Sequence, residues 1–267
     1  MRSMPNPSII LGAVAASVLL AAGAALSQTA PAAAPRTPVI VELFTAEGCS
    51  SCPPADNLLA ALERIQPIDG VEVIALGEHV DYWDQYGWQD RFSSGAYTAR
   101  QHDYGDKLRV PEPYTPQMIV DGTSQFNGTD AAAARRALDA AAHKPHLTLA
   151  LTSPTVDGRA VQAAVSFTGT PPGKPNARID LYAALVQPSA TTDVANGENK
   201  GHTLHHVAIV RTLTRIGTLG ELAAGPKTFT LQPPKDTPTA GFRIVVFAQL
   251  PGPGAVVGSA TAALPAP

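Results

Sequence analysis

The stretch that decides the fold runs from Glu42 to Asp56 and reads ELFTAEGCSSCPPAD. It begins within the apolar, β-rich run of residues 39–44, so we expect a central strand that ends in a turn at Gly48. After Cys52, two prolines fit the first turn of a helix, where their missing N–H groups are tolerated. Both cysteines of the chain therefore lie where the helix dipole favours a thiolate, at a spacing that can close a small disulfide.

The amino-terminal residues 1–27 have the features of a signal peptide. Residues 9–26 form an apolar, alanine-rich run, and Ala25-Leu26-Ser27 places small residues where a signal peptidase cleaves. We expect cleavage after this segment and no membrane span in the mature protein; the alternative is an uncleaved amino-terminal anchor. Residues 28–38, rich in alanine and proline, are expected to form a disordered leader.

Export predicts a periplasmic or secreted protein, in an oxidising location where disulfides persist. Because the chain has only two cysteines, Cys49 and Cys52 have no other intramolecular partner. The formal net charge of −3, without a run of lysine or arginine, argues against nucleic acid as a partner. A chain of 267 residues is long enough for two domains of ordinary size.

Residues 39–144 are predicted to form one α/β domain. The helix after the cysteines has one apolar face, and residues 71–76 form a second strand, parallel to the first because a helix connects them. The polar and aromatic residues 78–106 are interpreted as an insertion that is helical in part. The Asp121-Gly122 turn then predicts a hairpin, and residues 131–142 predict a last helix.

Residues 145–267 are predicted to form a β-sandwich-like domain. From residue 146 onward, short β-rich runs alternate with proline and glycine turns, and no long helix is indicated. The candidate strands are 147–152, 160–168, 179–186, 203–213, 228–231, 242–250 and 256–263. The expected fold class is therefore an α/β domain followed by an all-β domain.

The position of the cysteine pair between a strand and a helix resembles the thioredoxin superfamily. A lone Cys-x-x-Cys also occurs as half of a zinc site, but the sequence lacks a second half. Thioredoxin-like folds carry a cis-proline at the start of a later strand that leads into a hairpin and a last helix, and Pro116 matches that position. The resemblance implies that Thr115 and Pro116 face Cys49 and Cys52 and bind the backbone of an incoming extended peptide.

A closer resemblance covers nearly the whole mature chain. The segments that carry it are Val41–Thr45, Cys49–Asp56, His79–Asp84 with Gly87-Trp88, Tyr114–Gln117 and Gly197–Gly201. They are similar to the family called domain of unknown function 1223, a mostly bacterial, exported, thioredoxin-like group. The resemblance implies a thioredoxin-like fold and export, and it implies no established reaction.

The chemistry expected of the pair is thiol–disulfide exchange with a protein or peptide thiol or disulfide. Cys49, nearer the solvent-facing turn, would attack, and Cys52 would resolve the mixed disulfide. The Ser50-Ser51 spacer offers no cation to lower the thiol pKa, Glu47 would raise it, and strand alternation leaves open where Glu42 points. Two alternatives stay open: a noncatalytic binding module with a structural disulfide, and copper(I) handling by reduced thiols.

Polar and aromatic residues follow the second predicted strand. His79, Asp81 and Trp83 lie at its carboxyl end, the edge where open α/β sheets bind ligands, so they are candidates for the rim of the site. His79 is interpreted either as a proton relay or as a surface-loop histidine. The aromatic residues between 83 and 92 are expected to pack the insertion onto the core, and an exposed peptide-binding surface is the alternative.

No metal site and no cofactor are expected. At most part of the trio His202, His205 and His206 can converge as ligands, because the adjacent His205 and His206 of a strand point to opposite faces. The loop Glu198–Gly201 is interpreted either as a contact with the α/β domain or as a turn formed by asparagine and glycine. The sequence leaves the oligomeric state open.

Overall fold

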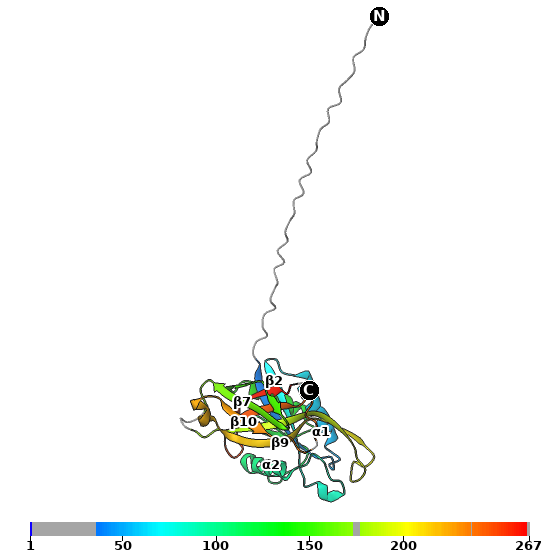
Figure 1. Ribbon diagram of the computed structural model, residues 1–267. Helices are drawn as coiled ribbons and strands as arrows, with labels where there is room; N and C mark the ends of the chain where they lie inside the picture. Colours follow the sequence, from blue (N-terminus) through cyan, green and yellow to red (C-terminus); the bar gives the residue numbers. More distant parts are fainter. Residues whose placement is uncertain (2–35, 173–176, 236, 266–267) are drawn as a thin grey trace. The chain divides into compact units, whose positions relative to one another are not determined.

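The structure is a computed structural model that describes Met1 and residues 36–265, except 173–176 and 236. From Arg36 onward, these residues belong to one compact unit (Figure 1). The predicted signal peptide beyond Met1, and the predicted leader up to residue 35, lie outside the described residues. Within the described part, no helix is long and apolar enough to cross a membrane.

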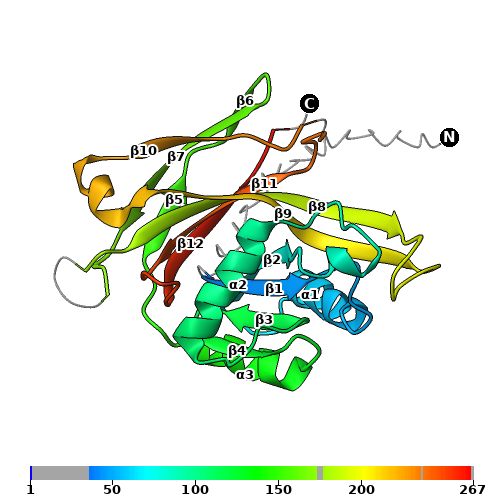
Figure 2. The ribbon, with the colours of Figure 1, turned by 90° about the horizontal axis from the view of Figure 1, so that it is seen from below.

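The centre of the fold is a mixed sheet with the strand order β12-β11-β8-β9-β2-β1-β3-β4 (Figure 2). Its strands are β1 (Thr37–Thr45), β2 (Val71–His79), β3 (Gln117–Val120), β4 (Ser124–Asn127), β8 (Asp180–Asp193), β9 (Thr203–Thr218), β11 (Arg243–Gln249) and β12 (Val256–Ala263). The predicted parallel pairing of β1 with β2 and the predicted β3–β4 hairpin are both confirmed. The leader prediction is wrong at its end: Thr37 and Pro38 belong to β1, because the Thr37 N–H donates to the Gly70 carbonyl and both residues pair with β2.

Three α-helices of the described residues pack on the β1–β4 half of this sheet. They are α1 (Pro53–Ile65), α2 (Gly95–Leu108) and α3 (Ala131–Ala142), and a short turn η1 (Asp84–Tyr86) precedes α2. Side chains of β1 alternate between the two faces of the sheet. Leu43 lies in the core that contains α1 and α3, whereas Phe44 packs edge-on against Tyr104 of α2 with ring centroids 6.1 Å apart. The alternation places Glu42 on the α2 face as well, where it bonds to Tyr104.

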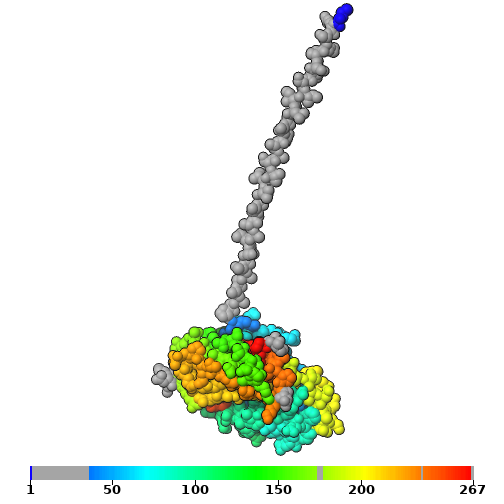
Figure 3. All heavy atoms as spheres, viewed as in Figure 1, coloured from blue at the N-terminus to red at the C-terminus, as the bar shows by residue number. Residues whose placement is uncertain are grey.

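A smaller sheet of order β10-β7-β5, with β6 paired to β7, covers the other half of the large sheet. Its strands are β5 (Thr148–Leu151), β6 (Thr155–Asp157), β7 (Ala160–Thr168) and β10 (Lys227–Leu231), with a 3-10 turn η2 (Leu219–Ala224) before β10. Figure 3 shows the green surface of β7 beside the orange surface of β10, in line with their antiparallel pairing. Apolar side chains such as Val161, Phe229 and Val246 form a second core between the sheets.

The fold is therefore mixed α/β with one large sheet to which both predicted domains contribute. The predicted domain boundary lies between residues 144 and 145. The large sheet crosses it without a break, because it contains β1–β4 from before the boundary and β8, β9, β11 and β12 from after it. β2 also extends the predicted strand through His79, and α2 runs past residue 106 to Leu108. The fold differs from a chain of two separately packed domains because β9 pairs in parallel with β2.

The junction between β2 and β9 positions the site. Gly77 pairs with Ile209, and a Cβ at Gly77 would lie 3.1 Å from the Val207 carbonyl oxygen, so glycine permits this close approach. β8 and β9 form a hairpin longer than predicted, reaching Asp193 on one strand and beginning again at Thr203 on the next. Its end loop lies against the turn between β1 and α1.

Candidate functional site

The two cysteines form a disulfide in the turn between β1 and α1, with the Sγ atoms 2.18 Å apart. Two prolines occupy the first turn of α1, as predicted. The serines between the cysteines are exposed, whereas Cys49 and Cys52 are both 0% exposed. The expected greater exposure of Cys49 is therefore absent, because both sulfurs lie in an apolar cluster that includes Phe44, Val80 and Tyr104.

Trp83 packs on the cysteine turn. Its Cβ would lie 3.3 Å from a Cβ added at Gly48, so any larger residue there would push the tryptophan back by a few tenths of an ångström. The indole Nε1–H of Trp83 donates to Oγ1 of Thr115 over 2.7 Å. Trp83 thus links the cysteine turn to the segment that precedes β3, and the expected packing role of this aromatic residue is confirmed.

The Thr115–Pro116 peptide bond is cis, as predicted. Pro116 lies beside the start of α1, since a Cβ at Gly128 would meet both the Pro116 Cβ at 3.0 Å and the Ala55 Cβ at 2.9 Å. The structure therefore brings Trp83, Thr115 and Pro116 together near the disulfide, although Trp83 and Thr115 are 32 residues apart in sequence.

The loop of residues 194–202, at the end of the β8–β9 hairpin, also lies on the cysteine turn. The Asn199 side-chain amide donates to the carbonyl oxygens of Glu47 (2.8 Å) and Cys49 (3.0 Å), and Asn199 is 3% exposed. The Ser50 N–H donates to Oε2 of Glu198 over 3.1 Å. Hydrogen bonds from Ser50 lower the pKa of the Glu198 carboxyl below its usual value. The interpretation of this loop as a contact with the α/β part is confirmed.

Glu47 is fully buried next to the disulfide. Its Oε2 accepts a hydrogen bond from Trp88 Nε1 over 2.7 Å, and its Oε1 lies 3.4 Å from Nε2 of His206 in β9. On its other side, Nδ1 of His206 lies 3.7 Å from Oδ2 of Asp56 in α1. Burial lowers the pKa of His206, but the carboxylates of Asp56 and Glu47 outweigh it and raise this pKa to about 9. His206 is therefore a buried cation at neutral pH.

His79 and Asp81 have different surroundings from those expected at a rim. His79 is 1% exposed, so the surface-loop alternative is wrong: the histidine ends β2 and packs among other buried side chains. Its Nδ1 lies 2.6 Å from Oδ2 of Asp90, and its ring is 4.8 Å from that of His206. Burial would raise the pKa of Asp90, but His79 and backbone N–H groups outweigh it and lower this pKa. Asp81 instead accepts a hydrogen bond from Thr98 of α2.

A second buried charge cluster lies on the α2 face. Nε of Arg100 donates to Oε1 of Glu42 over 2.6 Å and lies 3.7 Å from Oε1 of Glu78. The Tyr104 hydroxyl donates to Oε2 of Glu42 over 2.5 Å, and Tyr104 packs in the cysteine cluster. Burial raises the pKa of Glu78 well above its usual value, and the charge of Glu42 adds to the shift. Glu42 thus lies behind Tyr104, one side chain removed from the disulfide.

Sequence reasoning missed two members of the site, Asp56 and Asp90. Neither was singled out, since each meets its partner only after the hairpin and the insertion fold over the turn. The alternation of His205 and His206 was predicted and is observed: His205 is exposed and His206 is buried. Among the described residues, no group of three or more histidine, cysteine or acidic side chains is arranged to hold a metal ion.

Comparisons with known proteins identify relatives and leave the reaction open. Protein AGR_C_4864 from Agrobacterium tumefaciens has a similar structure, with 25% identity and a TM-score of 0.64, covering 86% of this chain and 96% of that one. HBP35 of Porphyromonas gingivalis, at 17% identity and a TM-score of 0.60, covers 87% and 77%. A comparison with curated protein sequences gave no match. Residues 40–249 match the family described as Protein of unknown function (DUF1223), and the chain belongs to that family.

Proposed function

We propose that this protein is an exported, thioredoxin-like thiol–disulfide oxidoreductase that acts on protein or peptide substrates through Cys49 and Cys52. The observation that carries the proposal is the disulfide at the strand-to-helix turn, with the cis Thr115–Pro116 bond nearby. The order of elements from β1 to α3, with β2-β1-β3-β4 adjacent in the sheet, supports a thioredoxin-like arrangement of this half. The apolar amino-terminal run supports export to the periplasm or beyond the cell.

The exchange step follows ordinary thiol chemistry. In the reduced protein, the Cys49 thiolate attacks one sulfur of a substrate disulfide, a mixed disulfide forms, and the other substrate sulfur leaves as a thiolate that takes up a proton. The Cys52 thiolate then attacks Cys49 Sγ and releases the second substrate thiolate. Substrate gains two electrons, the protein loses two, and an external dithiol restores the reduced pair by the same exchange.

The charges around the cysteine pair favour a protein that acts as a reductant of its substrate. Stabilising the thiolates of the reduced form makes a disulfide a stronger oxidant, and negative charge acts in the opposite sense. Glu47 and Asp56 are buried near the turn and Glu198 accepts from Ser50, whereas His206 supplies one positive charge. The balance is negative, so the disulfide form is favoured over the dithiol, and the reduced protein donates electrons readily.

Substrate access requires a local opening of the structure. Both cysteines are 0% exposed, beneath Trp83 and beside the Asn199 loop. The Trp83–Thr115 hydrogen bond joins one part of this cover to the segment before Pro116, so the cover and the peptide-binding segment would move together. The proposal therefore includes displacement of Trp83 when an extended peptide binds beside Thr115 and Pro116.

Thiol exchange and trapping test the proposal. The reduced protein is expected to reduce a model peptide disulfide, and Cys52→Ser is expected to retain the substrate as a mixed disulfide at Cys49. Cys49→Ser is the matched control, because it lacks the attacking sulfur. The reduction potential is expected at or below the roughly −270 mV of thioredoxin. Absence of exchange by the reduced protein, together with no trapping in Cys52→Ser, would exclude the oxidoreductase.

The complete burial of the disulfide favours one second candidate, a noncatalytic binding module. In that function the bond only fixes the turn on which Asn199 and Trp83 pack. A potential below about −300 mV, typical of structural disulfides, agrees with either function, so the exchange rate discriminates between them. A module would keep its partner affinity in a Cys49→Ala/Cys52→Ala variant, whereas the oxidoreductase would lose all turnover.

A further inference from the structure

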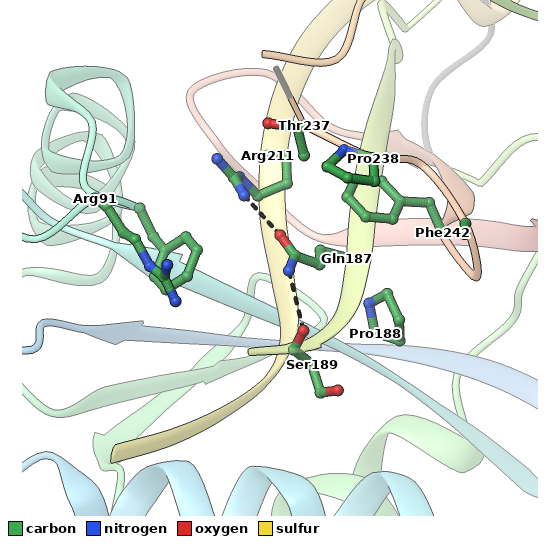
Figure 4. A pocket seen from close by; sticks show the side chains of 10 residues that line it. Arg91, Gln187, Pro188, Ser189, Arg211, Thr237, Pro238 and Phe242 are labelled. Atoms are coloured by element: carbon green, nitrogen blue, oxygen red, sulfur yellow. Dashed lines mark hydrogen bonds between the residues drawn. The ribbon is translucent and has the colours of Figure 1, made fainter. Parts of the chain in front are cut away.

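A pocket of about 380 Å³ lies away from the disulfide, between the insertion, the β8–β9 hairpin and the segment before β11 (Figure 4). Its lining has two kinds of wall. Arg91 and Arg211 supply positive charge, and Pro188, Pro238 and Phe242 supply apolar surface. A cavity with one charged and one apolar wall matches an organic ion better than a wholly apolar molecule.

The two arginines are held close to a common aromatic ring. Their guanidinium carbons lie 4.7 Å (Arg91) and 5.0 Å (Arg211) from the centroid of Phe92. Phe92 itself is buried, so both guanidinium groups are anchored against a fixed side chain. The pocket therefore presents two oriented positive charges rather than two freely moving ones.

In the described part of the chain, every hydrogen bond that the side chains of Arg91 and Arg211 donate goes to a neutral acceptor. Arg91 Nη2 donates to the carbonyl oxygen of Thr191 (2.8 Å) and to Oγ1 of Thr192 (3.2 Å). Arg211 Nη1 donates to Oε1 of Gln187 over 2.6 Å, and Gln187 in turn donates to the Ser189 carbonyl, as Figure 4 shows. Neither guanidinium forms an ion pair with any described carboxylate.

The acid next to Arg91 in sequence is engaged elsewhere. Asp90 accepts hydrogen bonds from the Glu47 and Phe92 N–H groups and pairs with His79. Burial lowers the pKa of Arg211 below its ordinary value; the charge of Arg91 acts in the same direction, and the charges of Tyr97 and Asp90 only partly offset it. The two positive charges thus repel each other across the pocket, and a bound anion would relieve this repulsion.

We propose that the pocket binds a small organic anion, whose carboxylate or phosphate group accepts hydrogen bonds from Arg91 and Arg211. Guanidinium groups match the geometry of both oxyanions, and each has donors beyond those used by its neutral partners. The apolar part of the ligand packs on Pro188, Pro238 and Phe242. The site is independent of the disulfide, because no cysteine lines it.

Ligand titration of the full chain tests this site. Phenyl phosphate and benzoate serve as probes for the two oxyanions, and benzyl alcohol serves as the uncharged control. Saturable NMR shifts at Arg91, Gln187 and Arg211 are expected with at least one anion and not with the alcohol. Arg211→Gln is expected to weaken binding by about tenfold or more, as loss of a charge-assisted hydrogen bond predicts.

A second variant of the pocket and a control variant outside it complete the binding test. Arg91 is exposed, so Arg91→Gln is expected to fold and to weaken binding even where Arg211→Gln does not fold. Arg136→Gln removes an exposed arginine of α3 and is expected to leave the affinity unchanged. The proposal is overturned when neither anion binds, when benzyl alcohol binds equally well, or when Arg91→Gln and Arg136→Gln have the same affinity as the unaltered protein.

Discussion

The side-chain amide nitrogen of Asn199 lies 3.0 Å from the carbonyl oxygen of Cys49, across 150 residues of sequence. The same amide bonds to the Glu47 carbonyl, so one side chain satisfies two acceptors of the cysteine turn. Asn199→Ala leaves both carbonyls without this donor in a buried position, and we expect a loss of about 1–3 kcal/mol in stability. The loosened turn should also be reduced faster by dithiothreitol, which a stopped-flow or quenched reduction assay measures.

Lys200→Ala provides the control for this prediction, because Lys200 is the exposed neighbour of Asn199 in the same loop. It should alter neither the unfolding free energy nor the reduction rate. Equal reduction rates for Asn199→Ala and the unaltered protein would show that the loop does not limit access to the disulfide.

Removing the buried charge of Glu47 should make the cysteine pair more oxidising. Glu47→Gln preserves the size of the side chain and an oxygen acceptor for Trp88, but it withdraws a negative charge from the vicinity of the reduced thiols. We expect the reduction potential to rise by tens of millivolts, since about 30 mV corresponds to 1.4 kcal/mol for this two-electron couple. Equilibration with glutathione buffers measures the shift.

Glu72→Gln is the matched variant, at the start of β2, opposite the end that carries His79. It should leave the potential unchanged. A potential in Glu47→Gln that stays at the original value, or falls, would contradict the electrostatic basis of the reductant assignment.

Local sequence patterns predicted the elements that surround the cysteines. The strand, glycine turn and proline-started helix follow from residues adjacent in sequence, and so do the hairpin at Asp121-Gly122 and the helix Ala131–Ala142. The cis bond before Pro116 was expected only through resemblance to a fold. Hydrophobic periodicity and turn residues were thus enough to predict those elements whose conformation depends on neighbours in sequence.

The shared sheet and the burial of the site depend on interactions that no local pattern encodes. Gly77 admits β9 beside β2, and only this pairing brings His206 toward Glu47 and Asp56. His79 follows an apolar strand and reads as a loop residue, but the insertion covers it through Asp90. Charge spacing along the chain could not reveal these contacts, because each partner comes from a different element.

The buried His206 cation should make stability fall in mildly alkaline solution. Its folded-state pKa of about 9 lies above the unfolded value of 6.5, so its contribution is complete below about pH 6.5 and is lost as the pH rises through about 9. The difference between the folded and unfolded pKa values corresponds to about 3 kcal/mol of folding free energy, lost between these two pH values. Urea unfolding of the oxidised protein at a series of pH values measures it.

His206→Gln should show a flatter pH dependence between these limits, whereas His205→Gln should retain the full dependence, because His205 is exposed on the opposite face of β9. Identical pH profiles for the two variants would rule out His206 as the responsible group.

Arg100 and Glu78 should differ sharply in their contributions to stability, although they lie in one buried cluster. Arg100→Met leaves the Glu42 carboxylate buried without its cation, and we expect a loss of about 3–5 kcal/mol. Burial and Glu42 raise the pKa of Glu78, so folding favours its neutral form, and Glu78→Gln keeps a neutral side chain of similar size; we expect a loss under about 1 kcal/mol. Urea unfolding of both variants at pH 7 measures the difference. A loss in Glu78→Gln as large as that in Arg100→Met would mean that Glu78 is ionised, with Arg100 shared between two carboxylates.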